Sequence, residues 1–277
     1  MPPSDRPAKI GQLTDFARKL RADVLRMTSR ARSSHVGSCL SAADLIAVLY
    51  GDILRFDPLQ PDWSDRDRLI LSKGHAAALI YATLAEVGFF STDELLEYGS
   101  NGGHLPGHVT TGVPGIELST GSLGHGLPVG VGMAIAGKRQ GSPWRVFVVT
   151  SDAEFDEGST WEAILFASHH HLENLVVVVD YNGIQSLNTV EQTLALEPFG
   201  DKLRAFGWHV VEVDGHDIGA LQAALSRLPA FPDRPTAVIA HTIKGKGVSF
   251  MEGQVAWHYR FASGDELQRA LAEIEAS

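Results

Sequence analysis

The segment "RVFVVTSDAEFDEGSTWEAILFASHHHLENLVVVVDYNGIQ" (145–185) indicates the fold of the chain. It begins with an apolar run over 145–150, continues through a helical pattern over 158–171, and returns to an apolar run over 175–180. The second run is apolar throughout rather than alternating until its final aspartate, which is typical of a strand covered on both faces. Two such strands joined by a helix predict parallel pairing.

The same alternation continues on both sides of this segment. Further strands are expected at 68–72, 208–213 and 236–242, and helices are expected near 9–31, 41–53, 74–88, 124–138, 158–171, 197–206, 217–227 and 263–275. This pattern predicts an α/β fold, with a parallel sheet flanked by helices on both faces. The stretch over 98–122 lacks periodicity and is rich in Gly, Pro and Thr, which predicts a functional loop.

Composition narrows the class of protein. The chain has 277 residues, 44% of them hydrophobic and 20% charged, which is an ordinary soluble profile. A formal net charge of −10 argues against binding to nucleic acid or to an anionic membrane. Cys39 is the only cysteine, which excludes an intrachain disulfide and favours a reducing compartment. The amino terminus has no apolar signal core and no run is long enough to span a membrane, so a cytoplasmic protein is expected.

Acidic residues gather where the first apolar run of the quoted segment ends. Asp152, Glu154, Asp156 and Glu157 follow it within a few positions. Acids there can cap a helix and favour its first turn, or they can bind a cation. In folds of this kind ligands bind at the carboxyl ends of the strands, which favours a functional role for these acids.

The second apolar run ends in a similar way. Asp180 and Asn182 follow it, and Asn182 lies 30 residues after Asp152, the length of one strand–helix–strand unit. A Mg²⁺ ion prefers oxygen ligands and takes one or two protein carboxylates together with phosphate oxygens. The alternative is a plain turn, because Asn-Gly is a strong turn dipeptide. These two segments alone leave the choice open.

Several motifs together resemble a known family. They are "SSHVGSCLSAADLIAVLY" (33–50), "LSKGHAAALIYATLAEVG" (71–88), "HLPGHV" (104–109), "ELSTGSLGHGL" (117–127), the acidic and Asn motifs above, and "AHTIKGKG" followed by "WH" (240–258). In this order they resemble the N-terminal, diphosphate-binding half of transketolase, over nearly the whole chain. The resemblance implies that residues 1–277 form a single thiamine diphosphate-binding domain. It also implies a transferase that moves a two-carbon ketol (glycolaldehyde) unit from a ketose, expected to be a sugar phosphate, to an aldose.

The resemblance also implies roles for particular residues. A divalent ion, Mg²⁺ or alternatively Ca²⁺ or Mn²⁺, would be bound by the side chains of Asp152 and Asn182 and by the carbonyl of Ile184. The positions implied in cofactor contact are His75, Gly121, Leu123, Asp152, Ala153, Asn182, Lys244 and His258. The residues implied in catalysis are three channel histidines and an acid at a subunit interface, namely His35, His108, His258 and Glu157. Imidazoles suit this chemistry because they donate hydrogen bonds to sugar oxygens and transfer protons near neutral pH.

The chain departs from the family pattern in sequence and in length. The family motif Gly-Asp-Gly is replaced by Ser151-Asp152-Ala153. Alanine would be strained if the backbone there needs a positive φ, whereas Ser151 adds a hydroxyl donor. The chain has no counterpart of the pyrimidine-binding and C-terminal domains, which are expected on a separate subunit in an α2β2 assembly. The alternatives are a related enzyme with a 2-oxo acid or a specialised substrate, and a non-catalytic scaffold subunit.

Overall fold

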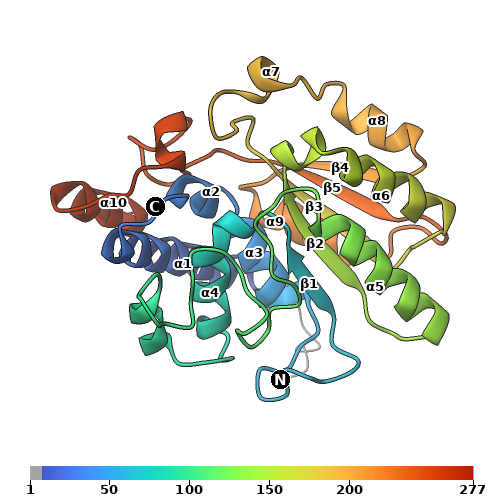
Figure 1. The fold of residues 1–277 in the computed structure, drawn as a ribbon, viewed down its shortest axis with the longest axis horizontal. Coiled ribbons are helices and arrows are strands. Elements are labelled where there is room, and N and C mark those ends of the chain that lie inside the picture. The colour runs from blue at the N-terminus through green and yellow to red at the C-terminus, as the bar shows by residue number, and fades with distance from the viewer. Residues whose placement is uncertain (1–7, 277) are drawn as a thin grey trace.

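The computed structural model describes residues 8–276 and places a five-stranded sheet at the centre of the chain (Figure 1). All four strand pairings are parallel, and the spatial order is β1-β2-β3-β5-β4. The strands are β1 (Arg68–Leu71), β2 (Val146–Ser151), β3 (Leu175–Tyr181), β4 (His209–Asp214) and β5 (Thr236–His241). The predicted α/β fold and each predicted strand are therefore confirmed.

Helices lie on both faces of the sheet. They are α1 (Ile10–Ala31), α2 (Val36–Ser41), α3 (Ala43–Val48), α4 (Ala77–Glu86), α5 (Gly126–Gln140), α6 (Gly158–His169), α7 (Val190–Thr193), α8 (Phe199–Ala205), α9 (Ile218–Ser226) and α10 (Asp265–Ala276). A π-helical turn follows α3 at Leu49–Ile53, and short 3₁₀ turns occupy Gly74–Ala76, Thr92–Glu97, Asp152–Asp156 and Val255–His258. Among the described helices, none is long and apolar enough to cross a bilayer.

Two apolar cores hold these layers together. One core contains residues of α1, α3, α4 and α9 on one face of the sheet, with α10 outside α1. The other contains residues of α5, α6 and α8 on the opposite face (Figure 1). Alternate residues of the central strands enter the two cores, as with Val176 and Val177 of β3. The uniformly apolar sequence of β3 follows from this burial on both faces.

The predicted helices are confirmed except at one boundary. The helix expected over 41–53 begins earlier, at Val36, after His35 adopts the left-handed conformation with φ 74°. It breaks at Ala42 before α3 begins. The small residues around Gly37 gave no helical signal because the surrounding packing, rather than propensity, decides their conformation. The short helix α7 was not predicted. The irregular loop predicted over 98–122 is confirmed, since it contains no helix or strand.

The strand order brings three loops to one end of the sheet. The chain leaves β3 for the edge strand β4 and then returns through β5, which lies between them. The carboxyl ends of β2, β3 and β5 are therefore neighbours, with Ser151 paired to Asp180 in the register. Ligands of open α/β sheets bind at such ends. The expectation that the amino terminus lacks a signal sequence concerns residues 1–13, of which residues 1–7 lie outside the described range.

Candidate active site

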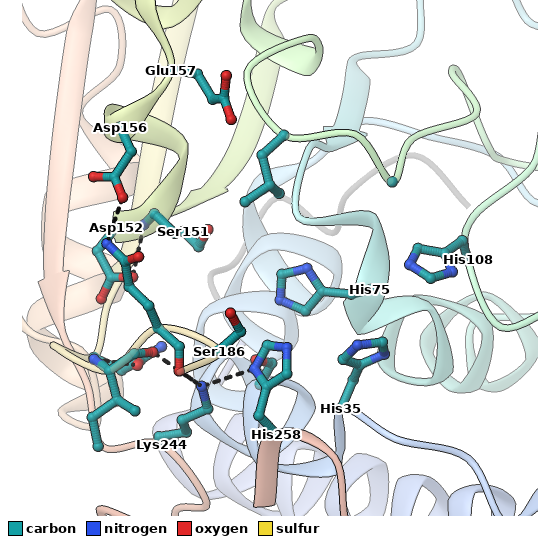
Figure 2. Close-up of a pocket in the computed structure, with 17 residues that line it drawn as sticks. His35, His75, His108, Ser151, Asp152, Asp156, Glu157, Ser186, Lys244 and His258 are labelled. Atoms are coloured by element: carbon teal, nitrogen blue, oxygen red, sulfur yellow. Dashed lines mark hydrogen bonds between the residues drawn. The ribbon is translucent and has the colours of Figure 1, made fainter. Parts of the chain in front are cut away.

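A cavity of about 350 Å³ lies at this end of the sheet (Figure 2). Segments from both halves of the chain meet there, including the loop over 98–122. Every site residue predicted from the sequence lines this cavity, namely His35, His75, His108, Gly121, Leu123, Asp152, Ala153, Glu157, Asn182, Ile184, Lys244 and His258. The structure thus brings together positions that are more than 200 residues apart in the sequence.

Asp152 is the first residue after β2, and two backbone donors orient its carboxylate. Its Oδ1 accepts a hydrogen bond from the Ala153 N–H at 2.8 Å, and its Oδ2 accepts one from the Gly183 N–H at 2.8 Å. The residue is 1% exposed. Helix α6 begins only at Gly158, so Asp152 does not cap that helix. The interpretation of these acids as a helix cap therefore does not hold for Asp152.

The loop after β3 faces Asp152 across the cavity edge. Gly183 adopts a positive φ of 72°, and the Asn182 Oδ1 accepts a hydrogen bond from the Ile184 N–H at 3.1 Å. The turn predicted from Asn-Gly is therefore present, and Asn182 and Ile184 of this turn line the cavity. Lys244, which follows β5, donates from its Nζ to the carbonyls of Ile184 and Gln185 at 3.0 and 3.1 Å.

Two charged groups at this edge have shifted pKa values. Burial, and after it the neighbouring Asp180 carboxylate, raises the pKa of Asp152 to about 6. Burial and the Lys73 charge lower the pKa of Lys244 to about 8. Within residues 8–276 no three His, Cys, Asp or Glu side chains form a metal-binding cluster. The donors available are a carboxylate, an amide oxygen and a carbonyl, which is an incomplete oxygen set that Mg²⁺ completes with phosphate oxygens and water.

A buried ion pair lies beneath this edge. Lys73 and Asp180 have side chains that are both 0% exposed, and they form a salt bridge. Lys73 also donates to the Ser38 carbonyl at 2.9 Å, while Asp180 accepts from the hydroxyls of Ser41 and Thr242. Burial alone would raise the pKa of Asp180, but the Lys73 charge and these hydrogen bonds hold it below its ordinary value. The pair ties β3 to α2 and to the turn before α4.

Four histidines form the opposite wall (Figure 2). The ring centroid of His35 lies 5.2 Å from that of His75, 5.6 Å from that of His108 and 4.9 Å from that of His258. Burial, and after it the His108 and Lys244 charges, lowers the pKa of His35 to about 4. Burial and Lys244 lower the pKa of His258 to about 3, and burial and Lys73 lower that of His75 well below 6.5. His35, His75 and His258 are therefore neutral at pH 7.

Contacts with neighbouring residues fix the tautomer of His258 and the backbone conformation of His35. The Lys244 Nζ lies 3.1 Å from the His258 Nδ1, and because an ammonium only donates, this nitrogen must accept. The proton of neutral His258 is then on Nε2, which makes that atom a donor. The His35 N–H donates to the His258 carbonyl at 2.7 Å, which helps to hold His35 at its positive φ.

The loop that carries Gly121 and Leu123 is packed closely against the cavity. A side chain at Gly121 would place a Cβ 3.1 Å from the His108 Cδ2. Glycine at this position therefore allows the His108 imidazole to pack against the loop. Glu154 anchors the loop from below, because its Oε2 accepts from the Gly124 N–H at 2.7 Å and from the Ser72 hydroxyl at 2.8 Å. Burial raises the pKa of Glu154 to about 7.

The altered motif is accommodated without backbone strain. Ala153 lies in the 3₁₀ turn Asp152–Asp156, and it is not among the described non-glycine residues with positive φ. The cavity also contains residues that the sequence did not single out as site residues, namely Ser38, Ser151, Asp156, Gln185 and Ser186. Ser151 and Asp156 were visible as polar residues at a strand end, but Ser38 and Ser186 had no local signal.

The neutral histidines predict a loss of stability in acid. The pKa of His35 is about 4 in the folded chain and about 6.5 when unfolded, so the unfolded chain binds more protons between these values. The free energy of unfolding is therefore expected to fall as the pH decreases through 6.5, and His35 contributes no further loss below about 4. Thermal unfolding at pH 7.5, 6.5 and 5.5 measures this slope.

The matched variants are His35→Gln and His169→Gln, since His169 is exposed at the end of α6. His35→Gln is expected to flatten the pH dependence of Tm, and His169→Gln is expected to leave it unchanged. Equal slopes for His35→Gln and the unmodified chain would contradict the prediction.

Comparison with known proteins agrees with this geometry. Residues 12–272 match the family described as transketolase, thiamine diphosphate binding domain. The chain is 39% identical over 259 residues to an apulose-4-phosphate transketolase subunit of Phocaeicola vulgatus, covering 92% of this chain and 91% of that protein. It is 38% identical to the 6-deoxy-6-sulfo-D-fructose transketolase subunit SqwG of a Clostridium species, covering 94% of each chain.

Solved structures show the same likeness. The transketolase of Leishmania mexicana superposes with a TM-score of 0.88 at 30% identity, over 98% of this chain and 42% of that one. The transketolase of Campylobacter jejuni superposes with a TM-score of 0.87 at 28% identity, over 96% and 42% of the two chains. This chain thus spans about two fifths of these solved transketolases. It belongs to the transketolase family, in which it corresponds to the thiamine diphosphate-binding domain.

Proposed function

We propose that this chain is the N-terminal subunit of a two-subunit transketolase that transfers a two-carbon ketol unit from an anionic ketose to an aldose. The observation that carries the proposal is the cavity in which an oxygen-rich strand edge faces neutral histidines. The relatives named as subunits are covered over more than 90% of their length, whereas single-chain transketolases are covered over about 42%. The naming of these relatives as subunits supports a partner that supplies the remaining domains.

The strand edge would hold the metal and the diphosphate. Asp152, the Asn182 Oδ1 and the Ile184 carbonyl are the proposed protein ligands of Mg²⁺, and Lys244 holds the Ile184 carbonyl in place. Thiamine diphosphate, when bound, supplies the electron sink for the carbanion of ketol transfer. The buried acid of Asp152, whose pKa is raised to about 6 without a cation, fits this assignment.

The histidine wall would bind and orient the sugar. The Nε2–H of His258 is a donor to a carbonyl or hydroxyl oxygen, and His35 and His108 lie beside it. Neutral imidazoles both donate and accept hydrogen bonds, which suits a polyol better than the single oxo group of a 2-oxo acid. Among the described residues that line the cavity, Lys244 is the one Lys or Arg, and its Nζ is already bonded to two carbonyls. The phosphate of the donor would then bind to the partner.

A surface for that partner lies next to the cavity. An apolar groove of about 410 Å³ runs between α5 and α6 and is lined by Phe166, which is 46% exposed. Ser159 lines the groove, and its hydroxyl donates to the Gly124 carbonyl at 2.7 Å. Glu157, two residues before Ser159, lines the cavity, so the groove and the cavity are adjacent. An exposed apolar patch of this kind marks an interaction site. It supports an α2β2 assembly with Glu157 at the boundary between subunits.

The alternatives are less well supported. A scaffold role was suggested only by the Ser-Asp-Ala motif, and the unstrained turn at Ala153 removes the physical basis for it. A 2-oxo acid donor remains the second candidate for the chemistry.

A cytoplasmic location is also proposed, which the buried free thiol of Cys39 favours.

Reconstitution tests the proposal. The chain mixed with a separately encoded pyrimidine-domain subunit, Mg²⁺ and thiamine diphosphate is expected to transfer the ketol unit of xylulose 5-phosphate to ribose 5-phosphate. The chain alone is expected to be slower by at least about 100-fold, because the partner supplies the acid–base glutamate. Full turnover by the chain alone would refute the two-subunit assignment, and turnover with pyruvate in place of the ketose would favour the second candidate.

A further inference from the structure

We infer that the Ser151 hydroxyl donates a hydrogen bond to the diphosphate of the cofactor, and so replaces a backbone donor. The inference rests on the proposed function and concerns a residue outside the predicted site set. Ser151 is the last residue of β2, is 5% exposed and lines the cavity beside Asp152 (Figure 2). Its Oγ has no hydrogen-bond partner among the atoms of the described residues. A buried hydroxyl without a partner is unfavourable, so a bound ligand that accepts from it gains affinity.

The backbone N–H of Ala153 is already occupied. In the resemblance to transketolase, the N–H of Ala153 is the group that faces the diphosphate. Here that N–H donates to the Oδ1 of Asp152 at 2.8 Å, within the same residue pair. Ser151 precedes Asp152 in the chain, and its hydroxyl has no hydrogen-bond partner among the described residues. The family motif has a glycine at this position, which offers no side-chain donor.

The chemistry of the hydroxyl matches a phosphate oxygen. Among the unpartnered buried side-chain atoms of the described residues, those that line the cavity are Ser151 Oγ and Asp156 Oδ1. The carboxylate of Asp156 only accepts when ionised and would repel a phosphate, whereas a serine hydroxyl donates. Thr150 also has a buried hydroxyl without a partner, but it does not line the cavity. Of the unpartnered buried atoms that line the cavity, Ser151 Oγ is therefore the one that can donate to an anion.

Calorimetry with matched variants tests the inference. The chain, assembled with its partner subunit, is titrated with thiamine diphosphate in excess Mg²⁺. Ser151→Ala is expected to raise the Kd about tenfold, because a hydrogen bond to a charged acceptor is lost. Thr150→Val removes a comparable buried hydroxyl outside the cavity and is expected to leave the Kd unchanged. Thiamine without phosphates is expected to bind equally to the unmodified chain and to both variants.

Ser151→Gly restores the family residue and separates the hydroxyl from its Cβ. If the hydroxyl binds the diphosphate, Ser151→Gly weakens binding about as much as Ser151→Ala. If Ser151→Gly instead binds the cofactor more tightly than the unmodified chain, the serine side chain only obstructs binding, and the inference is overturned. Suppose that Asp152→Asn abolishes cofactor binding but Ser151→Ala leaves the Kd unchanged. This result overturns the inference and leaves the proposed function standing. An unmodified assembly that does not bind thiamine diphosphate overturns both.

Discussion

Replacing Asp152 with asparagine is expected to weaken binding of thiamine diphosphate with Mg²⁺ by more than about 100-fold, because even outer-shell partners of a metal account for about 10–100-fold. The substitution preserves volume but removes the charge that attracts the cation. It also places an amide NH₂ against a backbone N–H, since the Ala153 and Gly183 amides each donate to one carboxylate oxygen. Neither orientation of the amide satisfies both donors.

Calorimetry on the assembled enzyme, together with kcat/KM for ketol transfer, measures this effect. Asp201→Asn is the control, because Asp201 is 73% exposed and pairs with Arg204 on the surface of α8. It is expected to change neither quantity, since exposed ion pairs contribute little. Binding by Asp152→Asn within tenfold of the unmodified assembly would rule out Asp152 as a metal ligand.

Replacing Lys73 with methionine is expected to lower the free energy of unfolding by about 3–5 kcal/mol, the loss typical of breaking a buried ion pair. Methionine fills a similar volume but leaves the Asp180 carboxylate buried without its cation. It also removes one of the two side-chain donors to the Ser38 carbonyl, since the Ser41 hydroxyl remains. Both side chains of the pair are 0% exposed, so solvent cannot replace the lost partner.

Denaturant unfolding of a short series of variants measures this effect. Lys138→Met is the surface control, because Lys138 and its partner Glu173 are about one-third exposed, and a loss of about 0–1 kcal/mol is expected there. Adding Asp180→Asn to Lys73→Met is expected to recover part of the stability, since the uncompensated charge is then removed. A loss below about 1 kcal/mol for Lys73→Met would contradict the assigned role of the pair.

Much of the fold could be predicted from local pattern. The uniformly apolar run of β3 predicted a strand covered on both faces, and both apolar cores do contact it. The start of α2 and the short helix α7 were not predicted. Helix α7 has four residues, too few for a periodic signal, and α2 begins after His35, whose left-handed backbone is held by a bond to the distant His258 carbonyl.

The candidate site was predicted from motifs, and the structure places all its members around one cavity. Their roles in binding and catalysis stay predictions until the variants are measured. The pairing of Lys73 with Asp180 could not be predicted, although both residues stood in the quoted motifs, because strand order decides which loops meet. The tautomer of His258 likewise depends on Lys244, which lies 14 residues earlier in the chain.

The sequence by itself determined the kind of fold and the residue types of the site, because period, burial and turn residues are local properties of the chain. The tertiary structure decided which donors are free. It left the buried Ser151 hydroxyl without a hydrogen-bond partner among the described residues, and it made His35 and His258 neutral. These outcomes follow from burial and from contacts between distant segments, and such contacts exist only when β2, β3 and β5 lie side by side.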